Sequence, residues 1–201
     1  MTNRKGERTK ELIVRKASAV FNCQGYMASS ISDIMHETGL GKGGIYNHFE
    51  SKEELMLAAF AFSLQTMGHF YAQALAGKHG CAQSLLSLAS VFEQMAQRDV
   101  LPGGCPIMNA AIEADDAIPL LLEKASEAMT HVSDMVRLIV NTAMKTGEVA
   151  ETVDTEYVTT VFISTLEGAL MLSKLYRDAT HMTRAIKHLK SFFSMELGLT
   201  V

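Results

Sequence analysis

A short stretch of the chain gathers side chains that proteins use to contact nucleic acid. Lysine offers a cation to phosphate, and asparagine can pair with two atoms on the edge of adenine. Glycine at the start of a helix lets the backbone approach the nucleic acid, and hydroxyl and imidazole groups donate hydrogen bonds to phosphate or bases. The candidate DNA contacts are Ser30, Gly41, Lys42, Gly43, Tyr46, Asn47, His48 and Lys52.

A second group of residues suits a cavity for a small molecule. Methionine and phenylalanine adapt to apolar ligands, although methionine at helical spacing also fits plain core packing. Glu167 lies in an otherwise apolar stretch, so it needs a partner, which a ligand cation or a neighbouring Lys174 or Arg137 can supply. The candidate ligand contacts are Phe92, Met95, Cys105, Met108, Asn109, Glu113, Phe162 and Glu167.

Cys105 has two interpretations. It follows Gly103 and Gly104 and precedes Pro106, at the expected start of a helix where the helix dipole favours a thiolate. This position suits a sensor of electrophiles or oxidants, but the sequence favours a small buried residue at a tight joint.

The sequence offers no pattern for catalysis, a cofactor or a metal. Its 7 His form no HExxH pattern, and no G-x-S-x-G is present. The run from Gly39 to Gly44 matches G-x-G-x-x-G, but it follows an expected helix where a dinucleotide site needs a strand. The 3 Cys contain no CxxC, which favours a reducing compartment. We therefore expect no enzyme, no cofactor and no bound metal.

The composition and the apolar periodicity predict an all-α protein. Only 3 Pro and no Trp, with many Ala, Leu and Met, favour helices. An apolar stripe predicts a first helix that ends near Gly25, and Ser30 with Asp33 forms a capping pattern for a second helix that Gly39 stops. Similar patterns predict further helices over 41–48, from 51 onward, and over 81–97, 106–114, 118–146, 154–177 and 183–196.

Charge divides unevenly along the chain. Residues 1–49 hold 7 basic and 4 acidic residues, a balance of +3, so the total of −4 leaves −7 for the remainder. A basic end on an acidic body is typical of a protein whose one end meets a polyanion. The most apolar stretch, 157–172, is interrupted by Glu167 and is shorter than a bilayer span of about 18 residues. We expect no membrane association and a cytoplasmic location.

The stretch 29–55 closely resembles the DNA-binding signature of the TetR family of transcriptional repressors. Gly39 and Phe49 stand where the family has them, as do Lys42, Gly43, Tyr46, Lys52 and Leu55. The segment 146–168 is similar to the family's regulatory domain. Gly41 stands where the family often has Ser or Thr, and a glycine caps a helix nearly as well. With Gly43 and Gly44 also present, we expect this helix to be weakly ordered when free and to order partly on DNA.

The resemblance implies two domains and a regulatory function. Residues 1–50 would form a three-helix helix-turn-helix domain, and 51–201 a larger helical domain that binds a ligand and forms a homodimer through the last two helices. The expected function is a ligand-responsive repressor that an organic, partly apolar effector releases from a palindromic double-stranded operator. The alternative is a helical ligand-binding or thiol-based redox sensor with weak or lost specific DNA binding.

Overall fold

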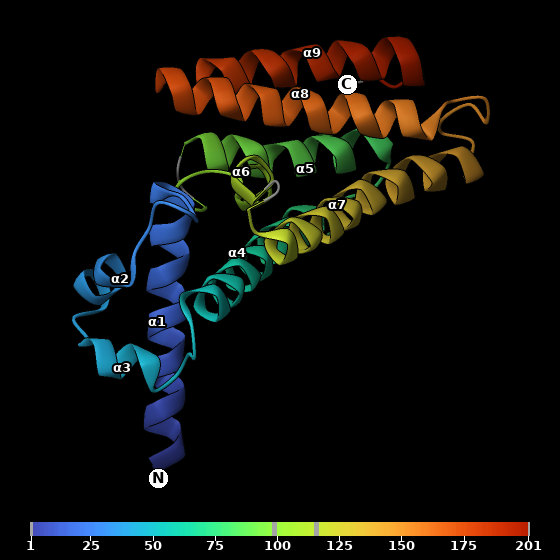
Figure 1. Ribbon diagram of the computed structural model, residues 1–201. Coiled ribbons are helices and arrows are strands. Elements are labelled where there is room, and N and C mark those ends of the chain that lie inside the picture. The colour runs from blue at the N-terminus through green and yellow to red at the C-terminus, as the bar shows by residue number, and fades with distance from the viewer. Residues whose placement is uncertain (1, 98–99, 115–116, 201) are drawn as a thin grey trace. The chain divides into compact units, whose positions relative to one another are not determined.

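The computed structural model describes residues 2–97, 100–114 and 117–200, without the side chains of 2–4, and these residues form helices joined by turns (Figure 1). This confirms the predicted all-α class. The helices are α1 (Thr2–Gln24), α2 (Ile31–Thr38), α3 (Lys42–Tyr46), α4 (Lys52–Leu75), α5 (Cys81–Ala96), α6 (Pro106–Ala114), α7 (Pro119–Lys145), α8 (Thr155–Tyr176) and α9 (Thr180–Leu197).

Most predicted helix limits agree with the structure to within one residue, and two differ by more. α3 ends at Tyr46, two residues before the predicted end, and His48 N bonds to Ile45 O in a tighter turn. α9 begins at Thr180, three residues before the predicted start at 183. The carboxylate of Asp178 accepts hydrogen bonds from Thr180 N and Oγ1, so a polar side chain supports this earlier start.

The chain forms two compact units, which we call unit 1 (residues 1–67 and 101–125) and unit 2 (68–100 and 126–201). Unit 1 holds α1, α2, α3, α6 and parts of α4 and α7. Tyr26 is buried at its centre, with its ring stacked on Phe21 and edge-on to Phe60, each at 6.0 Å between centroids. The predicted domain boundary after residue 50 does not coincide with the limits of these units, and it stays a prediction.

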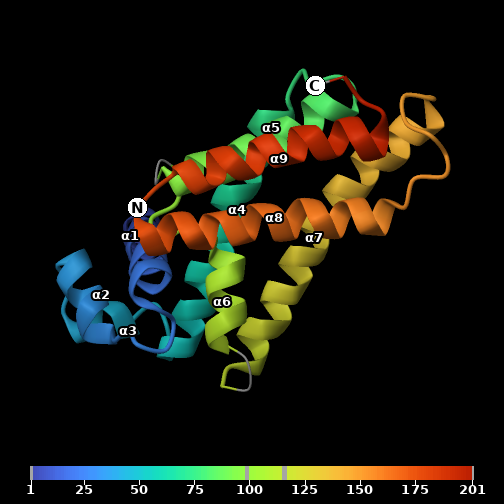
Figure 2. The same cartoon turned by 90° about the horizontal axis from the view of Figure 1, so that it is seen from above.

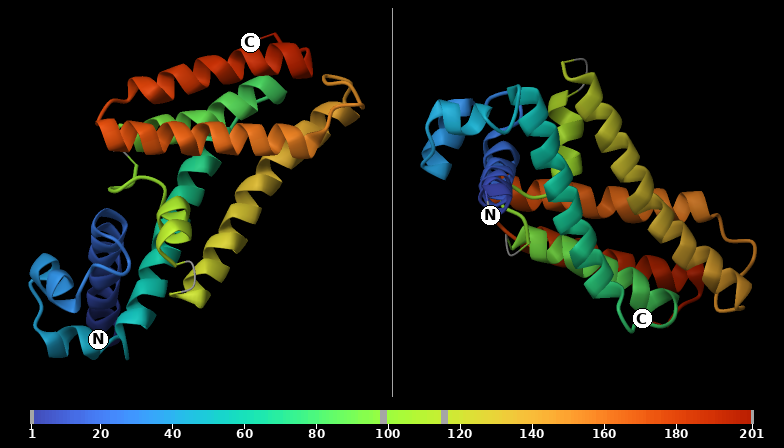
Figure 3. Two further views of the ribbon diagram at one scale, coloured as in Figure 1. Left: turned by 45° about the horizontal axis from the view of Figure 1, so that its top comes forward. Right: turned by 90° about the horizontal axis from the view of Figure 1, so that it is seen from below.

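Unit 2 is built around α5, α8 and α9. α8 and α9 lie side by side in antiparallel directions (Figure 2), and α5 packs against both (Figure 3). Phe162 of α8 stacks on Phe193 of α9 at 6.2 Å between ring centroids, and both are buried. Aromatic side chains therefore pack between the last two helices in the core of unit 2.

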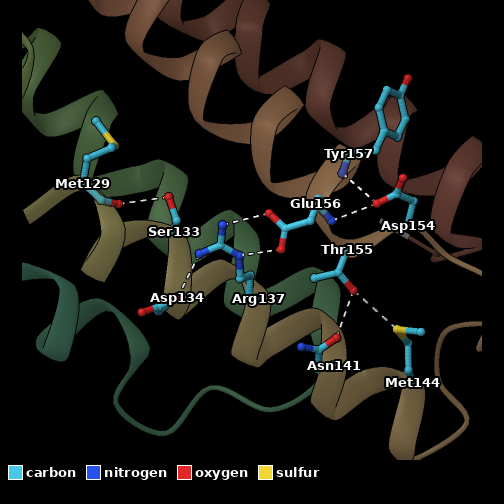
Figure 4. A network of polar contacts seen from close by, with 10 residues as sticks. All are labelled: Met129, Ser133, Asp134, Arg137, Asn141, Met144, Asp154, Thr155, Glu156 and Tyr157. Carbon is cyan, nitrogen blue, oxygen red and sulfur yellow. Dashed lines mark hydrogen bonds and ion pairs between the residues drawn. The ribbon is translucent and has the colours of Figure 1, made fainter. Parts of the chain in front are cut away.

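A polar network fixes the start of α8 against α7 (Figure 4). Arg137 Nε and Nη2 donate to the two carboxylate oxygens of Glu156 at 2.7 and 2.8 Å, and Arg137 Nη1 donates to Asp134. Asp154 caps α8 by accepting from the backbone N–H groups of Glu156 and Tyr157. The guanidinium hydrogen bonds lower the pKa of Glu156, and the two carboxylates raise the pKa of Arg137.

One side of α8 is not covered within the described chain. The sequence of this helix is apolar nearly all round, and in the single chain Tyr157, Met171, Leu175 and Tyr176 are exposed. By length and composition alone α8 is long and apolar enough to cross a membrane, a property that core helices of soluble proteins share. α8 packs on α5 and α9 through its buried side, and its last two turns leave Met171, Leu175 and Tyr176 exposed as an apolar strip.

Candidate nucleic-acid interface

The candidate interface begins at α2, whose first turn is capped as the sequence predicts. The Ser30 side chain accepts a hydrogen bond from Asp33 N, and the Asp33 carboxylate accepts one from Ser30 N at 2.7 Å. The Ser30 hydroxyl also donates to Asp33 Oδ2 at 2.6 Å. These bonds lower the pKa of Asp33, chiefly through the Ser30 side chain. Ser30 can donate to a phosphate only by redirecting the hydrogen that it gives Asp33.

The turn between α2 and α3 depends on a glycine. Gly39 adopts φ 70°, the left-handed conformation that closes a helix, and its N–H bonds to Met35 O. Two residues later Gly41 is the N-cap of α3, with no side-chain hydrogen bond at that end. The result is two short helices joined by a glycine turn, which is the arrangement of a helix-turn-helix.

Two buried residues orient α3. Ile45 is fully buried, and Phe49, just beyond the helix, is 2% exposed. With these side chains held in the core, Lys42, Tyr46 and Asn47 are exposed on the surface of unit 1. Tyr46 is 40% exposed, and Lys42 Nζ lies 5.8 Å from its ring centroid. The structure therefore presents a cation, a phenol and an amide together, the groups that contact phosphates and base edges.

Lys52 makes a contact within the protein that the sequence does not predict. Its Nζ donates to the backbone oxygen of Met27 at 3.1 Å, and Met27 N donates to the Glu113 carboxylate at 3.3 Å. The turn between α1 and α2 is thus held from α4 on one side and from α6 on the other. The predicted phosphate contact of Lys52 stays a prediction and competes with this hydrogen bond.

A buried pair of amides, missed at the level of sequence, joins the end of α1 to α6. Asn109 Nδ2 donates to Asn22 Oδ1 at 2.9 Å, and Asn22 Nδ2 donates to the backbone oxygens of Pro102 and Gly104. Gly103, at φ 92°, lies so close that a Cβ there would be 2.2 Å from Asn22 O. The Gly103–Gly104 pair was the available signal of this close approach.

The eight candidate ligand residues divide equally between the two units. Phe92 and Met95 on α5 and Phe162 on α8 are 1% exposed in unit 2, where α5 packs on α8, and Glu167 lies on the same α8. The other four belong to unit 1: Cys105, Met108, Asn109 and Glu113. An open surface pocket of about 330 Å³ in unit 2, beside Cys81 and Glu148, contains none of the eight. The ligand contacts stay a prediction.

The thiols differ in environment. Cys105 is 1% exposed, and its Sγ accepts a hydrogen bond from Met108 N at 3.5 Å, so it caps α6 from within unit 1. Burial, with the charge of Glu148 second, raises the pKa of Cys81 to about 12. Cys23 is the exposed cysteine. Among the described residues no group of three His, Cys, Asp or Glu side chains is placed to hold a metal ion.

Comparison with known proteins places this geometry in a family. Residues 13–59 match the model for bacterial regulatory proteins of the tetR family, and residues 81–189 match the tetracyclin repressor-like C-terminal domain. A TetR transcriptional regulator from Chloroflexus aurantiacus is 40% identical, with a TM-score of 0.93 over 96% of this chain and 98% of that one.

Two further relatives extend the comparison. An HTH-type transcriptional regulator in the lacX 3' region of Lactococcus lactis is 28% identical over 92% of this chain and 93% of its own. A cysteine mutant of the TetR regulator CifR, complexed with 26 bp double-strand operator DNA, has a TM-score of 0.71. It is 21% identical over 88% of this chain and 94% of its own, so its likeness concerns the fold.

Proposed function

Because the chain belongs to the TetR family of bacterial transcriptional regulators, we propose that it is a repressor which a small molecule releases from a palindromic operator. The family membership supports a transcriptional regulator with a helix-turn-helix DNA-binding domain, and the matched relatives named above are described as transcriptional regulators. The operator, the effector and the direction of regulation are parts of the proposal.

The observation that carries the DNA-binding proposal is the way Ile45 and Phe49 orient α3. With both apolar side chains in the core, Lys42, Tyr46 and Asn47 are left exposed beside a glycine-rich backbone. We assign Asn47 to an adenine edge and Lys42 to a phosphate or a guanine. We assign Tyr46, His48, Lys52, Ser30 and the backbone at Gly41 and Gly43 to phosphates bordering the groove.

The exposed strip on α8 supports the homodimer. Leu175 is 68% and Tyr176 63% exposed on this helix, and Met195 on α9 is 73% exposed, so the last two helices both leave large apolar side chains uncovered. A second copy that packs its own α8 and α9 on this strip would cover it. Two copies would present two α3 helices to half-sites about 34–36 Å apart, as a palindromic operator requires.

The effector is proposed to be organic and partly apolar. The α5 and α8 candidates, Phe92, Met95, Phe162 and Glu167, offer mostly apolar contacts and one carboxylate. Within unit 1, Asn109 and Glu113 of α6 contact the end of α1 and the following turn, so a ligand that competed for these side chains would disturb that turn. The protein would act on chromosomal DNA and hence in the cytoplasm. The burial of Cys105 gives the alternative thiol sensor no support.

Footprinting on the DNA that flanks the protein's own gene tests the proposal. We expect protection of a near-palindrome whose half-sites are about one helical turn apart. Asn47→Ala should lower the preference for this site over competitor DNA by roughly 1–3 kcal/mol per half-site, since a bidentate base contact is lost. Gln97→Ala, an exposed amide in unit 2, is the matched control and should bind as the wild type does.

Two outcomes would contradict the proposal. Binding that is salt-sensitive and independent of sequence would show that the α3 surface does not read bases. Equal specificity of Asn47→Ala and the wild type would remove Asn47 from the reading surface. Once a footprint exists, its loss on addition of candidate organic compounds identifies the effector.

A further inference from the structure

The first half of α1 lies outside the family match. The match begins at residue 13, but α1 begins at Thr2, so about three helical turns precede the matched region. We propose that this segment, residues 2–12, is a second DNA-binding surface, which holds the phosphate backbone of the duplex next to the bases that α3 reads. The inference rests on the proposed DNA binding and adds a contact that the helix-turn-helix does not supply.

The structure places this segment beside the end of α3, as α1 runs past α3 toward the N-terminus (Figure 1). A Cβ on Gly6 would lie 3.9 Å from Cε1 of His48, and Lys10 Nζ lies 5.1 Å from the ring centroid of Phe49. Gly6 is therefore level with His48. At 1.5 Å per residue, residues 2–5 project about 6 Å beyond that level. A duplex seated on α3 lies within reach of this projecting turn.

The charged groups suit phosphate. Lys5 and Arg8 are exposed, and neither forms an ion pair with a residue that the structure describes. Three residues apart, they lie on one side of the helix, whereas Glu7 points to the side opposite Lys5. By contrast, Lys16, further along α1, is already paired with Glu37 of α2 at 3.7 Å. Lysine offers phosphate a point charge, and arginine offers a bidentate fork.

The position of the segment argues for backbone contacts and against base reading. A recognition helix in the major groove has a phosphate strand on each side, so an element beside the end of that helix meets a strand and not the groove floor. Contacts to phosphate add affinity that is sensitive to salt and indifferent to sequence. The two surfaces would thus have different roles: α3 would provide specificity for the site, and residues 2–12 would raise the affinity for it.

The test is the salt dependence of DNA binding by the full-length double variant Lys5→Ala/Arg8→Ala. Alanine preserves the helix, so the change removes charge with little effect on structure. The matched control is Lys78→Ala/Lys145→Ala, which removes two exposed positive charges from unit 2. Each lost phosphate contact should reduce the slope of log K against log salt by about 0.9, so about 1.8 per protomer, while the control keeps the wild-type slope.

Two further readouts separate this surface from α3. The double variant should lose affinity for operator and for random duplex by the same factor, so its specificity ratio should equal that of the wild type. Asn47→Ala should show the reverse, a lower ratio with an unchanged slope. A double variant with the wild-type slope on a protected operator would overturn this inference and leave the proposed function intact. A wild-type protein without an operator footprint would overturn both.

Discussion

The two helices of the helix-turn-helix differ in what holds them. α2 has eight residues, a reciprocal Ser30–Asp33 cap at its start and the left-handed Gly39 at its end. α3 has five residues, two of them glycines, with Gly41 as a cap that provides no side-chain hydrogen bond. A helix of five residues is too short to be stable alone, and glycine weakens it further. The limits of α2 are therefore marked by its local sequence, whereas those of α3 depend on its buried contacts.

This difference suits the proposed roles. α2 supports the turn and must keep its place with or without DNA. α3 would make its remaining contacts with the operator, so part of its stability can come from the DNA itself. The ordering of α3 would then subtract from the affinity for every duplex, and the contacts to the correct bases would have to offset it.

The largest expected effect follows from truncating the buried isoleucine that packs each helix against the core. Ile45 in α3 and Ile34 in α2 are both fully buried, and truncation of a buried Ile to Ala costs about 2–5 kcal/mol. For Ile34→Ala we expect this full cost to appear as a lower free energy of global unfolding, measured in urea. For Ile45→Ala we expect a smaller loss there and a larger loss of operator affinity, because α3 can detach while the rest of unit 1 stays folded. If both variants lost the same unfolding free energy and the same operator affinity, α2 and α3 would not differ in how they are stabilised.

The next effect concerns the cap. Ser30→Ala removes both the hydroxyl that accepts from Asp33 N and the donor to the Asp33 carboxylate, and loss of an N-cap costs about 1 kcal/mol. Gly41→Ser, the matched change in α3, should stabilise that helix by only a few tenths of a kcal/mol, because glycine is already a fair cap. Urea unfolding of both variants measures the two changes in the free energy of unfolding. A neutral Ser30→Ala would show that α2 is held by packing and not by its cap.

The same contrast separates what sequence can predict here from what it cannot. The cap and the stop of α2 lie within ten residues of chain, so local chemistry predicts its limits. The sequence predicts the end of α3 two residues too late, because that helix ends in a tight turn over the buried Ile45 and Phe49 that no local residue type marks. Asn22 and Asn109 are 87 residues apart and meet only through the tertiary fold, so their pairing had no signal beyond two adjacent glycines.

A smaller effect is expected at the glycines of α3. A Cβ on Gly44 would lie 3.5 Å from Leu40 Cβ, an ordinary contact, and one on Gly43 would meet nothing within 4 Å. Either alanine should stabilise free α3 by about 0.5–1 kcal/mol and slow its amide exchange. Gly44→Ala should then tighten operator binding by several fold. Gly43→Ala should weaken binding, since its methyl group would stand between the backbone and the DNA. Wild-type α3 amides that exchange equally slowly with and without operator would contradict ordering on DNA.

The smallest effect is the response of the two helices to acid. Hydrogen bonds from Ser30 hold the pKa of Asp33 below its ordinary value of 3.8. A folded-state pKa below the unfolded one means that the carboxylate stabilises α2 above the ordinary value, and that this contribution is lost as the pH falls through the folded pKa. α3 has no acidic residue in its first turn and should not respond. In an NMR titration, amide signals of 31–38 should therefore shift with the Asp33 carboxyl while those of 42–46 do not. Ser30→Ala should move the Asp33 midpoint up toward 3.8, and a midpoint that stays where it was would mean that the cap bond does not control this carboxylate.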